Sequence, residues 1–180
     1  MRITLSGTPG AGKTVVANEL AKRLKLKHYS IGEFMRDIAK KKKYSLIKLS
    51  RLAEKSNVID KELDKKQINL KYKNNFVIDG RISFYFVPNS IKLFLDANFL
   101  TRAKRIFNDN RKGEHFSGLL NTKREIKERT NSERKRYKKY YDLDFLDKKN
   151  YDYYIDTTNL TVKQVTDRII SFIKKKKVSK

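Results

Sequence analysis

The chain has 180 residues, of which 44 are lysine or arginine and 20 are aspartate or glutamate, so its formal net charge is +24 at pH 7. This length suits one domain that buries roughly two-thirds of the surface exposed by the unfolded chain. The absence of cysteine excludes disulfides and thiolate metal sites, and no apolar run approaches the roughly 18 residues of a membrane span. Because a strand-like run begins at Ile3 and leaves no room for a signal peptide, we expect a cytoplasmic protein without membrane contact.

The positive charge suits a polyanionic partner, but its distribution argues against the reading of bases. Lysines gather in runs such as Lys40–Lys43 and Lys174–Lys177, without the arginine and aromatic residues that contact or stack on bases. Such runs also serve to keep helix ends solvated. We therefore expect no specific nucleic-acid partner.

Short β-rich runs alternate with helical periodicity along the whole chain. We expect strands at Ile3–Ser6, Lys27–Ser30, Phe76–Asp79, Ile91–Asp96 and Tyr153–Asp156. We expect helices at about 13–25, 32–42, 45–55, 57–72, 99–109, 122–141 and 161–176. The alternation predicts an α/β fold of three layers, α/β/α, with a five-stranded parallel sheet. In such a sheet, ligands bind beyond the carboxyl ends of the strands.

The first loop, GTPGAGKT at residues 7–14, fits the pattern G-x-x-x-x-G-K-[ST] and stands between a strand and a helix. Its backbone N–H groups would surround phosphate oxygens, aided by the positive end of the helix dipole. Lys13 would reach the β- and γ-phosphates, and the Thr14 hydroxyl would bind Mg²⁺. This P-loop predicts ATP binding by Gly7, Thr8, Pro9, Gly10, Ala11, Gly12, Lys13, Thr14 and Val15.

A second acidic element follows the third strand, in FVIDG at residues 76–80. Asp79 at the end of this apolar strand matches a Walker B carboxylate that orients Mg²⁺, although it could also cap the next turn. Asp96, which ends LFLD, is the competing candidate. We favour Asp79 because Gly80 and Arg81 follow it.

Phosphoryl transfer depends on positioning and charge neutralisation, so arginines indicate where the acceptor binds. Arg36 stands on the first turns of the helix after strand two, and Arg81 directly follows strand three. Either alone could form a surface ion pair. Beside a P-loop, both are expected to bind a phosphate through their planar forks.

The basic stretch KREIKERTNSERKRY, residues 123–137, has two faces when drawn on a helical wheel. Arg129, Glu133 and Arg136 are spaced i, i+4, i+7 and share one side with Ile126 and Tyr140. The opposite half carries Lys127, Arg134, Lys135 and Lys138. We predict that the first face lines a catalytic site and that the second is only solvated.

The segment RAKRIFNDNRKGEHFSG joins a helix that carries Arg102 and Arg105 to this basic helix. With Gly113 and Gly118 at its bend, it predicts a short hinged lid at about 111–122. A lid would exclude water, which otherwise accepts the phosphoryl group. His28 and His115 are expected to be structural or surface residues.

With these motifs in order, the chain closely resembles the cytidylate kinases, above all the compact archaeal type. The resemblance covers essentially the whole chain and rests on GTPGAGKT, SIGEFMRDIA, VIDKELDKKQ, VIDGR, IKLFLDA, TRAKRI, RTNSERKRY, YDLD and YDYYIDTT. Two departures are Asp142, where the family usually has glycine, and Ile31 within Ser30–Gly32, where a small residue is common.

The resemblance implies roles for individual residues. Arg36, Arg81 and Arg136 would hold the acceptor phosphate, while Arg129 and Glu133 would lie at the acceptor ribose and phosphates. Asp60, within VIDKELDKKQ, would also belong to the acceptor site. Arg102 and Arg105 would belong to the lid and the donor side, and Asp156 and Thr157 would lie by the donor adenine. The catalytic set would be Lys13, Arg81, Arg129 and Arg136.

The expected reaction is ATP + (d)CMP giving ADP + (d)CDP, with Mg²⁺ bound by Thr14 and Asp79. We expect a monomer with a core at 1–31, 73–110 and 142–180, an acceptor-binding segment at about 32–72, and the lid followed by a helix to 141. The alternatives are another P-loop small-molecule kinase, such as an adenylate-type kinase, and an ATPase that assists ribosome or RNA assembly. Assembly ATPases of that kind usually carry a histidine soon after the Walker B aspartate, where this chain has Gly80 and Arg81.

Overall fold

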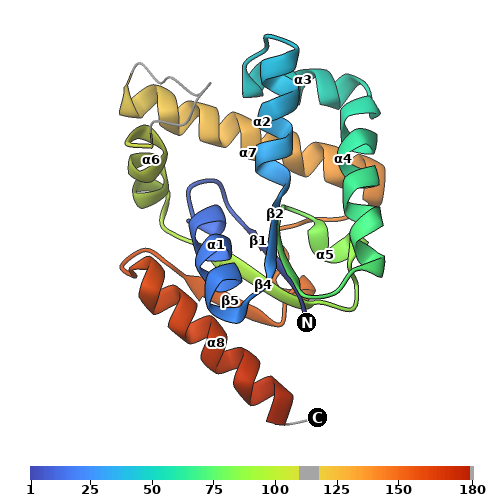
Figure 1. The fold of residues 1–180 in the computed structure, drawn as a ribbon. Coiled ribbons are helices and arrows are strands. Elements are labelled where there is room, and N and C mark those ends of the chain that lie inside the picture. Colours follow the sequence, from blue (N-terminus) through green and yellow to red (C-terminus); the bar gives the residue numbers. More distant parts are fainter. Residues whose placement is uncertain (110–117, 179–180) are drawn as a thin grey trace.

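The computed structural model describes residues 1–109 and 118–178, and its centre is a parallel sheet (Figure 1). Five strands of the described residues form this sheet in the order β2-β3-β1-β4-β5. They are β1 (Arg2–Gly7), β2 (Lys27–Ser30), β3 (Phe76–Asp79), β4 (Ile91–Asp96) and β5 (Tyr153–Asp156). The prediction of an α/β fold with a five-stranded parallel sheet is confirmed.

Helices connect the strands and cover the sheet. In chain order they are α1 (Lys13–Leu24), α2 (Ile31–Lys41), α3 (Leu46–Lys55), α4 (Val58–Ile68), α5 (Ser83–Phe86), α6 (Phe99–Phe107), α7 (Leu119–Tyr141) and α8 (Val162–Val178). Two short 3₁₀ helices complete the set, η1 (Asn69–Tyr72) and η2 (Lys148–Asn150). None of the described helices combines the length and the apolar character needed to cross a bilayer.

Two hydrophobic cores lie on the two faces of the sheet. On one face α1 and α8 pack together against the strands, with Ile3, Leu20 and Ile169 among the fully buried side chains (Figure 1). On the other face Tyr137 of α7 packs with Phe145 and with Phe94 of β4. Burial on both faces explains why the central strands read as continuous apolar runs.

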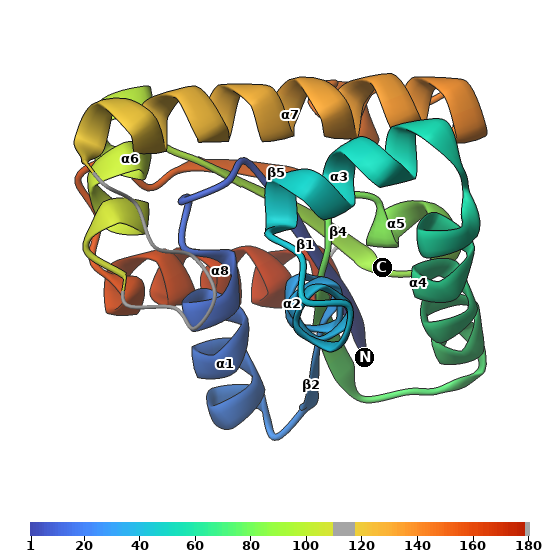
Figure 2. The same cartoon turned by 90° about the horizontal axis from the view of Figure 1, so that it is seen from above.

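Helices α2, α3 and α4 form a further unit with a core of their own, which includes Met35, Ile38, Leu49 and Leu63. The long helix α7 runs past this unit at one end and past α6 at the other (Figure 2). Helix α7 therefore connects the α2–α4 unit with α6.

The elements differ from the predictions by one or two residues at several ends, and more clearly at three places. The helix expected at 57–72 ends at Ile68 and continues as η1, because Leu70 packs with Phe76 of β3 instead of following the helical face. Helix α5 was not expected, since SFYF carries no helical periodicity. Helix α7 begins at Leu119, so the last part of the expected lid is its first turn, and residues 110–117 lie outside the described residues.

Candidate active site

The loop between β1 and α1 curls closely against its neighbours. Gly7, Gly10 and Gly12 have φ values of 145°, 81° and 88°. A Cβ added to Gly10 would lie 2.6 Å from the carbonyl oxygen of Arg102, and one added to Gly7 would lie 2.1 Å from that of Leu95. Gly12 is the N-cap of helix α1 and provides no side-chain cap, so the first N–H groups of the helix remain available to an anion.

Lys13 lies folded over this loop. Its Nζ donates hydrogen bonds to the carbonyl oxygens of Gly7 at 2.9 Å and Thr8 at 2.7 Å. Burial, and next the Arg81 guanidinium, lower the pKa of Lys13 well below its ordinary value. A phosphate beside the ammonium would favour its charged form and reverse that shift.

Asp79 ends β3 beside the loop and is 3% exposed. Among the described residues its Oδ2 has no hydrogen-bond partner, and the Nε2 of His28, which also has none, lies 3.5 Å away. Burial alone would raise the pKa of Asp79, but contacts with His28, Ser30 and Thr14 outweigh it and hold the pKa below its usual value. An ionised carboxylate oxygen without a hydrogen bond among the described residues, near Thr14, fits Mg²⁺, which prefers oxygen ligands and octahedral geometry.

Sequence reasoning treated His28 only as a structural or surface residue. It comes near Asp79 because β2 pairs with β3, with Ser30 opposite Asp79 and His28 opposite Val77. The strand order that brings them together was not part of the sequence prediction. The other histidine, His115, lies outside the described residues.

Glu133 holds two arginines of the cleft. It is 5% exposed, and its two oxygens accept hydrogen bonds from Arg81 Nε at 2.6 Å and Arg129 Nε at 3.2 Å. Burial would raise the pKa of Glu133, but Arg81 and Arg129 lower it to about 2. Arg81 also donates to the carbonyl oxygen of Gly7 at 2.8 Å, which ties this cluster to the phosphate loop.

Arg136 forms a second buried ion pair, with Asp60 of α4. Its Nη1 lies 2.8 Å from Oδ1 and 2.9 Å from Oδ2 of Asp60, and Arg136 is only 3% exposed. Among the described residues, the Nε of Arg136 has no hydrogen-bond partner. The pair joins α7 to the α2–α4 unit.

One cleft collects most of the residues predicted for catalysis, metal binding and acceptor binding. Its lining includes Gly10, Gly12, Lys13, Thr14, Arg36, Asp79, Arg81, Arg129, Glu133 and Arg136. They come from the P-loop, α2, the end of β3 and α7, which lie at the carboxyl-terminal end of the sheet. Asp60 lines an adjoining recess instead.

The burial along α7 agrees with a division into two faces, although Arg134 and Lys138 of the exposed face form ion pairs with Asp144 and Asp142. Ile126, Glu133 and Arg136 are buried, whereas Lys127, Arg134, Lys135 and Lys138 are exposed. The α7 residues that were predicted to be catalytic therefore belong to the inward face.

A second cavity opens on the other side of the P-loop. It is lined by loop residues 10–12 and by apolar Val15 and Val162, with Arg105 and Thr157 at its edge. Arg105 donates to the Thr157 hydroxyl at 3.0 Å and to its carbonyl oxygen at 2.7 Å. Asp156 is outside this lining, and its Oδ1 accepts a hydrogen bond from the N–H of Thr158 at 2.8 Å.

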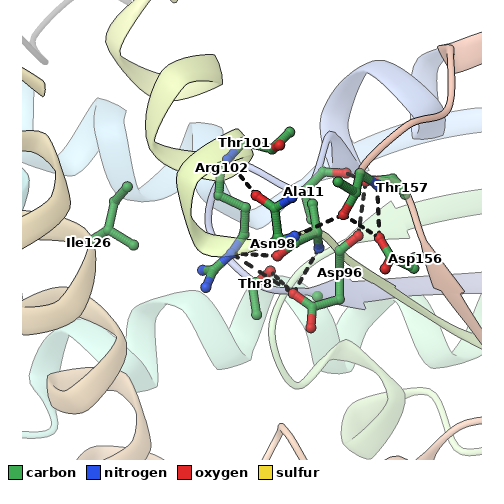
Figure 3. A network of polar contacts seen from close by, with 12 residues as sticks. Thr8, Ala11, Asp96, Asn98, Thr101, Arg102, Ile126, Asp156 and Thr157 are labelled. Carbon is green, nitrogen blue, oxygen red and sulfur yellow. Dashed lines mark hydrogen bonds and ion pairs between the residues drawn. The ribbon is translucent and has the colours of Figure 1, made fainter.

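Asp96, the other candidate for the metal site, instead forms hydrogen bonds that stabilise the P-loop (Figure 3). Its Oδ1 accepts hydrogen bonds from the Thr8 hydroxyl at 2.6 Å and the Ala97 N–H at 2.9 Å, and its Oδ2 accepts one from the Tyr154 hydroxyl at 2.7 Å. The Thr157 hydroxyl lies 3.0 Å from the Ala11 carbonyl oxygen, which ties the loop to the end of β5. The geometry therefore supports the choice of Asp79 for the metal.

The comparisons with known proteins agree with this geometry. Residues 2–159 match the Cytidylate kinase-like family. A cytidylate kinase of Sulfolobus acidocaldarius is 35% identical over 179 residues, which cover 98% of this chain and 96% of the relative. A cytidylate kinase of Methanocaldococcus jannaschii is 34% identical, with 96% and 97% of the two chains covered.

Solved structures at lower identity share the fold. The shikimate kinase of Acinetobacter baumannii matches with a TM-score of 0.63 at 18% identity, over 98% of this chain and 94% of that one. An uncharacterized protein of Eubacterium ventriosum matches with a TM-score of 0.69 at 23% identity, over 97% and 98% of the two chains. With a family match over most of its length and relatives that cover it almost entirely, the chain belongs to the cytidylate kinase-like family.

Proposed function

We propose that this protein transfers the γ-phosphoryl group of ATP to CMP, giving ADP and CDP, and that dCMP is also an acceptor. The observation that carries the proposal is that one cleft is lined both by Lys13 of the P-loop and by Arg36, Arg81, Arg129 and Arg136. A phosphate loop on one side and a group of arginines on the other suit two nucleotides whose phosphates meet. The relatives named cytidylate kinases supply the identity of the acceptor.

The reaction needs positioning and charge neutralisation more than a general base. An oxygen of the acceptor phosphate attacks the γ-phosphorus, and the bond from that phosphorus to the β–γ bridging oxygen breaks. Lys13, Arg81 and Arg129 would neutralise the charge of the transferring group. Arg36 and Arg136 would hold the acceptor phosphate by bidentate hydrogen bonds.

Thr14 and Asp79 would hold Mg²⁺. The Oδ2 of Asp79, which has no hydrogen bond among the described residues, supports this role. Within the described residues no group of three or more His, Asp or Glu side chains forms a metal cage, which suits an ion completed by phosphate oxygens and water. When bound, Mg²⁺ would neutralise the β- and γ-phosphate oxygens of ATP.

The donor would occupy residues 7–15 of the P-loop and the adjoining cavity. Arg105 and Thr157 at the edge of that cavity support a place for the adenine there, and Asp156 would lie next to it. Residues 32–72 would form the acceptor-binding segment. We expect a monomer, because one chain supplies every residue of the proposed site, and we expect it to act in the cytoplasm.

The test is steady-state kcat/KM with ATP as donor and CMP, dCMP, UMP, AMP and GMP as acceptors. CMP and dCMP should be preferred. If AMP or GMP exceeded CMP, the cytidylate assignment would be wrong. Lys13→Ala is the control for the chemistry, because loss of a buried charge beside the transferred group should reduce kcat by roughly a hundredfold or more.

A further inference from the structure

A small recess continues the cleft between α4 and α7. The cleft and the recess share Ile31, Leu63, Arg81 and Tyr137 in their linings. The recess adds Asp60, Asp64, Gln67 and Ile82. Half of its lining residues are apolar or aromatic, and α4 contributes a polar edge with Asp60, Asp64 and Gln67. The recess admits only about 10 Å³, room for about one water, so the ring of a flat group joined to a phosphate would lie in the cleft, whose volume is about 90 Å³, with one polar edge turned toward the recess.

Hydrogen bonds fix what this polar edge presents. The Ser83 hydroxyl donates to Oε1 of Gln67 at 2.7 Å, so the Gln67 amide presents its Nε2 hydrogens as donors. The Tyr141 hydroxyl donates to Oδ2 of Asp64 at 2.6 Å, which leaves Oδ1 as an acceptor. Asp60 differs from both, because Arg136 contacts both of its oxygens.

An acceptor beside a donor matches one side of the cytosine base. Cytosine carries a donating N4 amino group next to an accepting N3. We propose that Asp64 and Gln67 are the specificity-determining residues for cytosine, with Oδ1 of Asp64 accepting from N4–H and Nε2 of Gln67 donating to N3. Ser83 and Tyr141 are positioning residues that fix these two side chains. The inference rests on the proposed function, since it places the base of the acceptor nucleotide.

Uracil would meet the wrong partners in the same place. Its O4 accepts and its N3–H donates, so the Asp64 oxygen would face another oxygen and the Gln67 amide would face another N–H. In a buried place no water replaces the missing partners, so the mismatched oxygen and N–H groups stay without hydrogen bonds. A site of this kind therefore rejects the wrong base more strongly than an apolar pocket does.

The decisive variant is Asp64→Asn, which keeps the shape of the side chain and can supply an N–H to uracil O4. The ratio of kcat/KM for CMP to that for UMP should fall by at least roughly tenfold. The ratio for CMP to dCMP should stay unchanged, because both carry the same base. Glu62→Gln is the matched control, since Glu62 is an exposed carboxylate on the same helix and should leave both ratios unchanged.

A second variant tests the positioning. Ser83→Ala frees the Gln67 amide to rotate and offer its oxygen to uracil N3–H, so the CMP-to-UMP ratio should again fall. Equilibrium binding of CMP and UMP without ATP, together with thermal unfolding, separates base recognition from turnover and from folding.

Unchanged CMP-to-UMP ratios in both variants would overturn the inference, as would a shift confined to the CMP-to-dCMP ratio. A wild-type protein that phosphorylates neither CMP nor UMP would instead overturn the proposed function.

Discussion

Carboxylates hold the arginines of the cleft in place through buried ion pairs. Glu133 contacts Arg81 and Arg129, and Asp60 contacts Arg136. Because removal of one partner from a buried pair leaves an uncompensated charge, each arginine needs its carboxylate for stability as well as for orientation. That Glu133 and Asp60 also touch the acceptor stays a prediction.

Some of these contacts could be predicted from the sequence, and others could not. The i, i+4 spacing places Arg129 and Glu133 on one side of a helix, and the structure has their hydrogen bond. The contact of Arg136 with Asp60 spans 76 positions, so no local spacing reveals it. The Asp64 and Gln67 edge was missed for the same reason, since its partners Tyr141 and Ser83 come from other elements.

Asp142 shows how a departure from the family pattern is accommodated. It stands where glycine is usual and takes the left-handed conformation at the end of α7, with φ 51°. Its N–H donates to the Lys138 carbonyl oxygen at 3.1 Å, so the helix end is capped despite the side chain. Aspartate tolerates this conformation better than most residues other than glycine, so the left-handed turn forms here with aspartate in place.

At the residue scale, we predict that discrimination against UMP weakens at low pH. Burial raises the pKa of Asp64 to about 6, the Tyr141 hydrogen bond opposes the rise, and Asp60 adds to it. The charged or titratable groups that line the recess with this carboxyl or contact it are Asp60, Arg81, Tyr137 and Tyr141. Above about pH 6 the carboxylate accepts from cytosine, whereas below it the protonated group can donate to uracil O4.

The measurement is the CMP-to-UMP ratio of kcat/KM between pH 5 and pH 8. The ratio should fall as the pH drops through about 6, while titration of the acceptor phosphate cancels between the two nucleotides. In Asp64→Asn the ratio should be flat. A wild-type ratio that stays constant over this range would contradict the prediction.

At the element scale, α7 is the structural link of the site. Its inward face brings arginines to the cleft, and its two ends contact the α2–α4 unit and α6. The two faces were predictable from the 3.6-residue period, but the start at Leu119 was not. Its first turn closes through the Thr122 N–H, which donates to the carbonyl oxygen of Gly118 at 3.0 Å, without a side-chain cap.

The two faces of α7 should respond differently to substitution. Arg136→Lys keeps the charge but loses the planar fork, so kcat/KM for CMP should fall by at least roughly tenfold, which is about 1.4 kcal/mol of transition-state stabilisation. Lys127→Ala on the exposed face should change it by less than roughly twofold, because exposed charges are screened by salt. Thermal unfolding of both variants separates catalysis from stability. If Arg136→Lys and Lys127→Ala changed kcat/KM equally, the prediction that only the inward face of α7 serves catalysis would be wrong.

At the scale of the whole molecule, a chain of net charge +24 carries a cleft proposed to bind two anionic nucleotides. Exposed lysines rarely fix a ligand, but their summed field raises the local concentration of anionic substrates. The total charge is evident from the sequence. Which arginines line the cleft, and which lysines remain on the exposed surface, could be learned only from the folded structure.

We therefore predict that salt weakens the binding of the anionic substrates. Raising NaCl from about 0.05 M to about 0.3 M should lower kcat/KM for CMP several-fold, mainly through KM, because screening shortens the range of the field. The unfolding midpoint, measured over the same range, controls for stability. A fall in kcat at constant KM would place the effect on the chemistry instead.

The hydrogen bond from Thr157 to Ala11 has a consequence for the order of folding. The two residues are 146 positions apart, so the shape of the P-loop depends on a strand that is synthesised late. Contacts of such long range form slowly, because a large loop must close before they stabilise the chain. A nascent chain that has already made residues 7–14 therefore lacks a complete phosphate site until β5 docks beside β4, and nucleotide affinity should appear among the last events of folding.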